Sequence, residues 1–208
     1  MNYSAEVYLF RHGEAQNNID SHIITGRGDD VPLTSLGIEQ ATRLGSILID
    51  TKIVPDLVYS SPALRARSTA ELALKSVGFT KKILIDGRLH EQHTGDWTGK
   101  FAKEIFTEET IRQIESKGKS FRSPNGESMN DVGLRMYEWL NDNSNCGIVF
   151  GFTHGGAIRS LASELLNWSH AQTYQTQPGN TSVSVFRRHP EGIWEVHDIA
   201  ADPESLVK

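Results

Sequence analysis

The chain has 208 residues, of which 38% are hydrophobic and 23% charged, the composition of an ordinary globular protein and not of a disordered one. Its formal net charge of −5 gives no general attraction to nucleic acid or to an anionic membrane surface, so neither is expected as a partner. The single cysteine, Cys146, excludes an intrachain disulfide and disfavours a structural zinc site.

Six apolar or β-branched runs along the chain predict strands, at residues 7–10, 57–59, 83–85, 148–152, 182–186 and 194–197. Two helices are predicted between them. One follows Pro32 and the candidate cap Thr34, and the other covers residues 63–77 and stops at Gly78. Strands that alternate with helices predict an α/β fold, a three-layer α/β/α sandwich with a mostly parallel central sheet.

The last two predicted strands lie close together in the sequence. Only a short polar segment around residues 187–192 separates them, whereas a parallel crossover needs a dozen or more residues. We therefore expect these two strands to pair antiparallel, which makes the sheet mixed.

Residues 100–122 carry six basic residues and four glutamates among apolar side chains at helical spacing. Two interpretations remain open, a surface helix with a charged outer face and a lid over a binding site. We expect an insertion at the substrate rim over about residues 99–128.

Two of the predicted strands end in similar polar sequences. Residues 7–10 are followed by Arg11-His12-Gly13-Glu14, and residues 148–152 by Thr153-His154-Gly155-Gly156, where the glycines open a helix. The ends of strands in α/β sheets are where ligands collect, and the N-terminus of a helix offers backbone donors to an anion.

Two further segments place polar groups after strands. Ser61-Pro62 starts a helix that carries Arg65, a good anion ligand, while Arg67 lies on a different face of that helix. Glu91 precedes a loop that turns at Gly95 and Gly99. His90 and His93 suit a shared metal only on a helix, and this glycine-rich stretch is a poor helix, so no metal is expected.

These segments, taken in order, resemble the histidine phosphatase superfamily, which includes the cofactor-dependent phosphoglycerate mutases and many small phosphatases. The matching residues are Arg11-His12-Gly13-Glu14, Asn18, Thr25-Gly26, Pro32-Leu33-Thr34 with Gly37, Ser61, Arg65-Ala66, Thr69-Ala70, Glu91, Gly95, Gly99, Gly126-Glu127-Ser128 and His154-Gly155-Gly156.

The resemblance implies a phosphoglycerate mutase-like fold and a role for each matching residue. His12 would be the nucleophile and become a transient phosphohistidine, and Glu91 would protonate the leaving oxygen. Arg11, Arg65 and His154 would hold the phosphoryl oxygens, assisted by Asn18. Thr25, Gly26 and Gly155 would border the substrate. Glu14 and Asp96 are rivals of Glu91, and Glu14 is expected to be structural.

Departures from the mutase pattern favour a phosphatase. Thr94 stands where the mutases carry tyrosine, and Ala15 where many relatives carry serine or threonine. The basic, proline-rich segment of the mutases has no counterpart between Gly99 and Gly126. We therefore expect a metal-independent, cofactor-free phosphomonoesterase of a small phosphorylated metabolite. The alternatives are a phosphoglycerate mutase and a non-catalytic module that binds a phosphorylated ligand.

The remaining expectations concern the chain as a whole. The first ten residues lack the basic start and long apolar core of a signal peptide, and no apolar stretch approaches the ~20 residues of a membrane span. We expect a cytoplasmic protein, a single catalytic domain over residues 1–208, without a membrane partner and with a homodimer as an open option.

Overall fold

The computed structural model describes residues 3–20 and 22–207, and its centre is a six-stranded sheet in the order β3-β2-β4-β1-β5-β6. The strands are β1 (Ala5–Arg11), β2 (Leu57–Ser60), β3 (Leu84–Ile85), β4 (Gly147–Thr153), β5 (Val183–Arg188) and β6 (Trp194–Ala201). Each of the six predicted strands is therefore present, with ends shifted by a few residues.

The pairing of the strands confirms the predicted mixed sheet. β1 pairs parallel with β4, and β2 pairs parallel with both β4 and β3. β5 runs antiparallel to β1 and to β6. Because β1, β2 and β4 are parallel neighbours, their carboxyl ends meet at one edge of the sheet.

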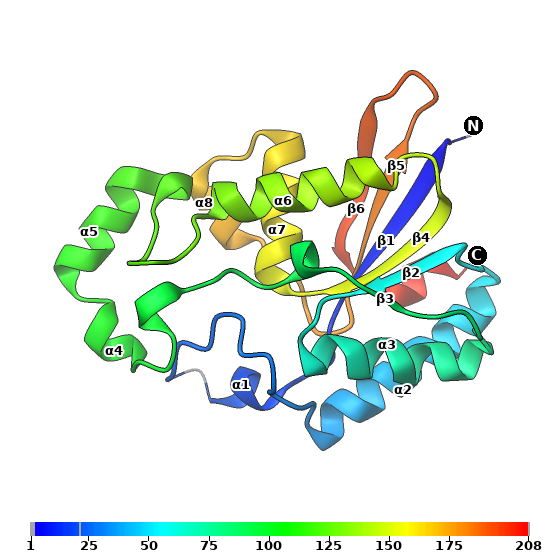
Figure 1. The fold of residues 1–208 in the computed structure, drawn as a ribbon, viewed down its shortest axis with the longest axis horizontal. Coiled ribbons are helices and arrows are strands. Elements are labelled where there is room, and N and C mark those ends of the chain that lie inside the picture. Colours follow the sequence, from blue (N-terminus) through cyan, green and yellow to red (C-terminus); the bar gives the residue numbers. More distant parts are fainter. Residues whose placement is uncertain (1–2, 21, 208) are drawn as a thin grey trace.

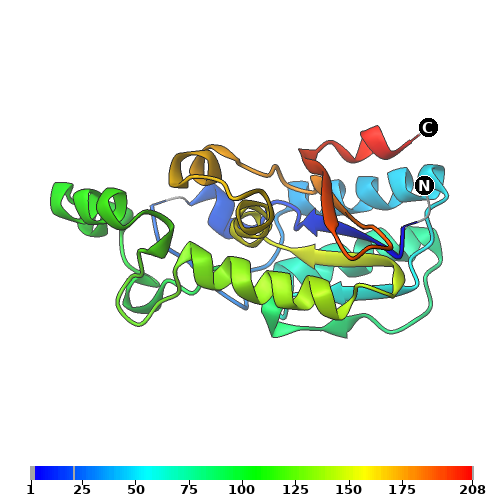
Figure 2. The same cartoon turned by 90° about the horizontal axis from the view of Figure 1, so that it is seen from above.

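Helices cover both faces of the sheet, which confirms the three-layer sandwich (Figures 1 and 2). α2 (Ser35–Thr51) and α3 (Leu64–Val77) lie on one face, and α6 (Met129–Asp142) and α7 (Gly155–Leu166) on the other. Alternate residues of β1 supply the two cores: Tyr8 and Phe10 pack on the α2–α3 side, Val7 and Leu9 on the α6–α7 side. Burial of each large apolar side chain stabilises the fold by roughly 1.5–3 kcal/mol.

Local sequence signals explain where these helices begin and end. The side chain of Thr34 accepts a hydrogen bond from the backbone N–H of Gly37 at 3.0 Å, as predicted for the cap of α2. α3 ends at Gly78, which adopts the left-handed conformation with φ of 68°. Ser128 and Asp131 form a capping box at the start of α6, a helix that the strand and motif patterns did not single out.

Residues 100–122 do not form one helix. The segment divides into α4 (Ala102–Ile105), α5 (Glu108–Lys117) and the 3-10 turn η3 (Gly118–Ser120). Thr107 caps a new helix by accepting from the N–H of Thr110, and Gly118 ends it with φ of 54°. α4 and α5 extend beyond the edge of the sheet at which β1 and β4 end (Figure 1).

Short elements complete the fold: α1 (Gln16–Ile19), α8 (His170–Gln175), and the 3-10 turns η1 (Gly87–Leu89), η2 (Gly95–Trp97) and η4 (Pro203–Leu206). Within residues 3–20 and 22–207, every helix is too short or too polar to cross a membrane.

Candidate active site

The register of the sheet brings the two histidine motifs together. Arg11 is the partner of Thr153 in the parallel β1–β4 pair, so His12 and His154 both follow directly after paired residues. Their ring centroids lie 5.1 Å apart. Ser61 joins them, because its N–H donates to the carbonyl of Phe152 at the end of β4.

His12 is buried, with 3% of its surface exposed, and the bonds of its ring define its protonation. Nδ1 lies 2.7 Å from the carbonyl oxygen of Gly13, which can only accept, so Nδ1 carries the proton. Nε2 accepts a hydrogen bond from Nε of Arg65 at 3.2 Å and therefore keeps its lone pair. Burial, followed by the charge of Arg65, lowers the pKa of His12 from its ordinary 6.5 to about 3. His12 is thus a neutral imidazole whose Nε2 is unprotonated and accepts the hydrogen bond from Arg65.

Arg65 is the hub of the pocket and is 1% exposed. Besides His12, its guanidinium donates to Nδ1 of His154 at 3.1 Å and to the carbonyl oxygens of Gly28 and Arg27, at 2.6 and 2.9 Å. α3 carries it into place, since Arg65 lies in the first turn after β2. Burial lowers the pKa of Arg65, but a guanidinium stays protonated in proteins, so this group is a fixed positive charge beside His12.

Arg11 supplies a second positive charge. Its Nη1 donates to the carbonyl of Pro178 at 2.6 Å, while its buried Nε has no hydrogen-bond partner among the described residues. A Cβ added to Gly155 would lie 3.4 Å from this Nε, so the glycine lets the helix start approach Arg11 closely. The charge of Arg159, one turn along α7, also acts on Arg11, although burial is the main reason that the pKa of Arg11 is lowered.

The side chain of Glu91 contacts the first turn of α7. Its Oε2 accepts from the N–H of Gly156 at 2.9 Å and its Oε1 from the N–H of Gln92 at 2.8 Å. The carboxylate is close enough to Arg11 and Arg65 to counteract the lowering of both pKa values by burial. The structure thus brings Glu91 into the pocket of His12.

The two rivals of Glu91 are engaged elsewhere. Glu14 accepts a hydrogen bond from the hydroxyl of Thr34 at 2.8 Å, beside the start of α2. Asp96 is exposed and accepts from the side chain of Asn125 at 3.0 Å. The side chain of Glu14 is therefore tied to the residue that caps α2.

His154 is fully buried, and both of its ring nitrogens contact the protein. Nδ1 accepts from Arg65, so Nε2 carries the proton of the neutral ring and donates to Oγ of Ser61 at 2.8 Å. Ser61 in turn lies 3.5 Å from Nδ1 of His90, which is 3.5 Å from Asp29. In this arrangement His154 orients the guanidinium of Arg65.

Three buried histidines predict that the protein loses stability in acid. Burial is the main cause that lowers the pKa of His12, His154 and His90. The unfolded chain therefore binds protons below pH ~6.5 that the folded protein does not bind, so the free energy of unfolding falls as the pH drops toward 3. His12 alone contributes up to ~1.4 kcal/mol per pH unit.

Urea unfolding between pH 7 and pH 4, in phosphate-free buffer, measures this effect. His12→Asn is expected to reduce the slope of the unfolding free energy against pH. Identical slopes for the variant and the wild type would show that His12 titrates normally in the folded protein.

The other predicted substrate residues lie around this pocket. Oδ1 of Asn18 accepts from the N–H of Ala15 at 2.9 Å, so its amide faces the chain that follows His12. Thr25 accepts from the side chain of Asn17 at 3.0 Å. Gly26 has φ of 49°, and a Cβ there would lie 2.3 Å from Oγ1 of Thr94. Thr25 and Gly26 belong to the loop in which the carbonyls of the next two residues, Arg27 and Gly28, accept hydrogen bonds from Arg65.

Several contributors escaped prediction from the sequence. Asn180 donates to the carbonyl of His12 at 3.1 Å, and Arg159 stacks over the ring of Tyr174 with 5.0 Å between its Cζ and the ring centroid. Arg135 binds the chain around Glu91. For Arg159 the sequence offered one signal. It lies four residues after Gly155 on α7, so both residues are on the helix face that meets the pocket.

The residues of the pocket carry positive charge without a cluster of metal ligands. In the part of the chain that the structure describes, no group of three or more His, Cys, Asp or Glu side chains is arranged to hold a metal ion. Two guanidinium groups, a neutral imidazole whose Nε2 is unprotonated and a carboxylate instead share one buried edge of the sheet. This combination suits an anion that reacts at His12.

Comparison with known proteins gives relatives of this chain. The 2,3-bisphosphoglycerate-dependent phosphoglycerate mutase of Rhizobium meliloti (strain 1021) is 31% identical over 171 residues, which cover 78% of this chain and 80% of the relative. Among solved structures, a mycobacterial glucosyl-3-phosphoglycerate phosphatase superposes with a TM-score of 0.76 at 26% identity and covers 95% of this chain and 99% of its own. A phosphoserine phosphatase from Entamoeba histolytica, solved with 3-phosphoglyceric acid, has a TM-score of 0.79 at 25% identity and covers 95% and 98%.

The family comparison covers nearly the whole chain. Residues 7–202 match the model of the histidine phosphatase superfamily, branch 1, and this span contains all four of the motifs that meet at the sheet edge. The chain therefore belongs to the histidine phosphatase superfamily.

Proposed function

We propose that this protein is a metal-independent phosphomonoesterase that hydrolyses a small phosphorylated metabolite through a phosphohistidine on His12. The observation that carries the proposal is the protonation of His12. Its Nε2 is unprotonated and accepts a hydrogen bond from Nε of Arg65 at 3.2 Å. Only an uncharged imidazole can attack phosphorus, and the lowered pKa keeps His12 uncharged at neutral pH.

The reaction proceeds in two displacements. Nε2 of His12 attacks phosphorus, the bond from phosphorus to the ester oxygen breaks, and Glu91 gives its proton to the departing oxygen. Water then attacks the phosphorus of the phosphohistidine, the bond from phosphorus to Nε2 of His12 breaks, Glu91 accepts a proton from that water, and inorganic phosphate leaves. Arg11 and Arg65 stabilise the charge that spreads over the phosphoryl oxygens, which is the main requirement of phosphoryl transfer.

A phosphoglycerate mutase is the second candidate, favoured by the names of the curated relatives. In a mutase the phosphoryl group stays on the enzyme until it returns to a bound phosphoglycerate. Thr94, in place of the tyrosine of the mutases, and the absence of their basic, proline-rich segment between Gly99 and Gly126 favour hydrolysis. The solved relatives that are described as phosphatases support the same choice.

Purified protein is incubated with p-nitrophenyl phosphate and EDTA to test the proposal. Hydrolysis is expected between pH 5 and 8, and no hydrolysis anywhere in that range would refute it. A second assay supplies 3-phosphoglycerate primed with 2,3-bisphosphoglycerate. Formation of 2-phosphoglycerate faster than release of inorganic phosphate would favour the mutase.

Gly156 provides a test of the role of Glu91. A Cβ at this position would lie 2.2 Å from Oε1 of Glu91, so Gly156→Ala must displace the carboxylate. Because that oxygen is the end of a flexible side chain, the fold should tolerate the change while kcat falls by about 100-fold. Gly87→Ala is the matched control, since a Cβ there meets no atom within 4 Å.

Thermal unfolding and kcat are measured for both glycine variants. An unchanged kcat in Gly156→Ala, with the folded state intact, would remove Glu91 from the reaction.

A further inference from the structure

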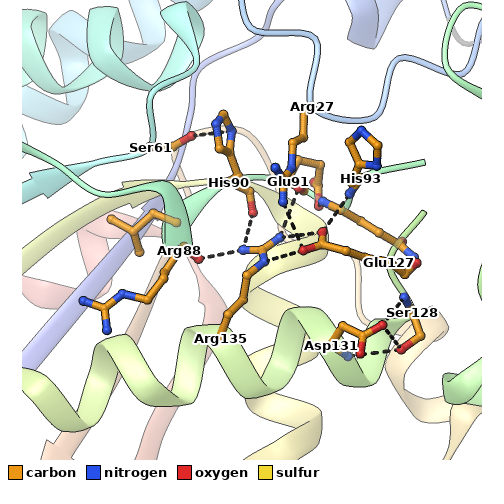
Figure 3. A network of polar contacts seen from close by, with 12 residues as sticks. Arg27, Ser61, Arg88, His90, Glu91, His93, Glu127, Ser128, Asp131 and Arg135 are labelled. Carbon is orange, nitrogen blue, oxygen red and sulfur yellow. Dashed lines mark hydrogen bonds and ion pairs between the residues drawn. The ribbon is translucent and has the colours of Figure 1, made fainter. Parts of the chain in front are cut away.

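We propose that Arg135 is a positioning residue for the proton-transfer step, held in place by Glu127, and that the pair fixes Glu91 without touching the substrate. The inference rests on the proposed function. It assigns the positioning of Glu91 to α6, a helix that carries none of the proposed catalytic groups. Figure 3 shows the network.

The guanidinium of Arg135 binds the backbone on which Glu91 is mounted. Its Nη1 donates to the carbonyls of Arg88 and His90 at 2.6 and 2.8 Å, and its Nη2 donates to the carbonyl of Glu91 at 3.1 Å. Three carbonyls within four residues therefore depend on one side chain (Figure 3). No regular strand or α-helix holds this stretch, which begins within the 3-10 turn η1 and continues beyond its end.

Glu127 fixes the guanidinium from the other side. Oε1 accepts from Nε of Arg135 at 3.0 Å and Oε2 accepts from its Nη2 at 3.2 Å, a two-pronged pair. Oε2 also accepts from the backbone N–H of His93 at 2.9 Å. Glu127 thus anchors the chain just after Glu91, while Arg135 anchors the chain up to it.

The carboxylate of Glu127 is also linked to the loop that binds Arg65. Arg27 donates to Oε1 of Glu127 at 3.0 Å. The carbonyl of Arg27 accepts from Nη2 of Arg65 at 2.9 Å, so the loop that holds Arg65 is tied to the pair that holds Glu91. The two halves of the site are joined through Glu127.

Burial and a rigid support make these contacts effective. The side chains of Arg135 and Glu127 are 13% and 21% exposed, so solvent screens the pair less than a surface ion pair. Burial alone raises the pKa of Glu127, but the hydrogen bonds from Arg135 and from the backbone of His93, together with the charges of Arg135 and Arg27, hold that pKa below its ordinary value. α6 is fixed in turn by buried apolar residues, among them Val132, Met136 and Trp139.

Displacement of Glu91 has a characteristic consequence. A phenolate that is a weak base leaves phosphorus without help, whereas a more basic phenolate needs a proton from Glu91. A poorly placed Glu91 therefore slows phosphoenzyme formation from phenyl phosphate much more than from p-nitrophenyl phosphate. General damage to the fold or to phosphate binding would slow both equally.

The experiment measures the rate of phosphoenzyme formation, by rapid quench, for a series of aryl phosphates from phenyl to p-nitrophenyl. In Arg135→Met the ratio of the p-nitrophenyl to the phenyl rate is expected to rise by about 30-fold over wild type, and in Arg135→Lys by less. The Kd for inorganic phosphate should stay within about 2-fold, because Arg11 and Arg65 remain.

Arg122→Met is the matched control. Arg122 donates to Asp131, which lies on α6 like Arg135, at 2.6 Å. The side chain of Arg122 is 61% exposed and lies outside the pocket. Its rate ratio should equal that of wild type. Should Arg135→Met fail to fold, Glu127→Gln provides the same test. It weakens the ion pair with Arg135 and is expected to raise the ratio of the p-nitrophenyl to the phenyl rate as well.

Equal slowing across the aryl series, or an unchanged ratio, would overturn the inference while leaving the proposed function intact. If the wild type itself forms no phosphoenzyme from any aryl phosphate, the proposed function fails instead. The two failures are therefore distinguishable.

Discussion

His12→Ala is expected to abolish turnover and covalent labelling together. The methyl group of alanine offers no lone pair to phosphorus, so the two-step route is closed. Enzymes that lose their nucleophile typically lose ~10⁴-fold or more in kcat and retain only what binding and electrostatics supply. The remaining pocket keeps Arg11 and Arg65, so inorganic phosphate should still bind.

Labelling with a radioactive phosphate ester separates catalysis from mere binding. Wild type is expected to carry acid-labile, base-stable phosphate, as a phosphohistidine does, and His12→Ala to carry none. His93→Ala is the control, because this nearby imidazole contacts the carbonyl of Asn125 and lies outside the site. Equal labelling of all three proteins would place the phosphate on another residue, and no labelling of wild type would favour a non-catalytic module.

Arg65→Met should have the second largest effect, a loss of about 1,000-fold in kcat/KM. The substitution removes the charge beside His12 and the donors that face Nε2 of His12 and Nδ1 of His154. It also frees the loop at Arg27 and Gly28, whose carbonyls lose their partner. One substitution thus removes electrostatic stabilisation and misplaces its neighbours.

A second readout comes from the titration of His12. Burial is the main cause of its lowered pKa and would persist, while the contribution of Arg65 disappears, so the pKa should rise but stay below 6.5. Imidazole NMR signals followed against pH measure this change. Arg67→Met, two residues along α3, is the control, since Arg67 makes no hydrogen bond to a pocket residue within the described chain. Similar losses in both variants would mean that charge on α3, and not the geometry of Arg65, matters.

The sheet and its motif-bearing ends could be predicted because both have local signals. Val7–Phe10 of β1 is an apolar run, and the polar residues that follow it mark where the strand ends. The same holds for His154 after β4. The one long helix predicted at residues 100–122 was wrong, because an apolar spacing continues across Thr107 although that residue starts a new helix.

Contacts to backbone carbonyls left no trace in the sequence. Arg135 binds carbonyls that lie 44 to 47 residues away, and any residue type supplies a carbonyl. Asn180 likewise binds the carbonyl of His12 across 168 residues. Motifs therefore indicated the candidate reacting groups and Glu127, while Arg135 and Asn180 emerged only from the three-dimensional arrangement. The catalytic roles themselves stay predictions until the variants are measured.

The position of β1 in the sheet also bears on how the protein is made. Of the six strands, β1 is synthesised before the others, yet its partners are β4, which ends at Thr153, and β5, which ends at Arg188. At ~5–20 residues per second, roughly ten to thirty seconds of synthesis pass before both partners exist. During that time the apolar run ahead of His12 has unpaired edges, which favours association with other chains. His12 follows the first strand of the sheet in chain order, but its surroundings are completed by strands that are synthesised long after it.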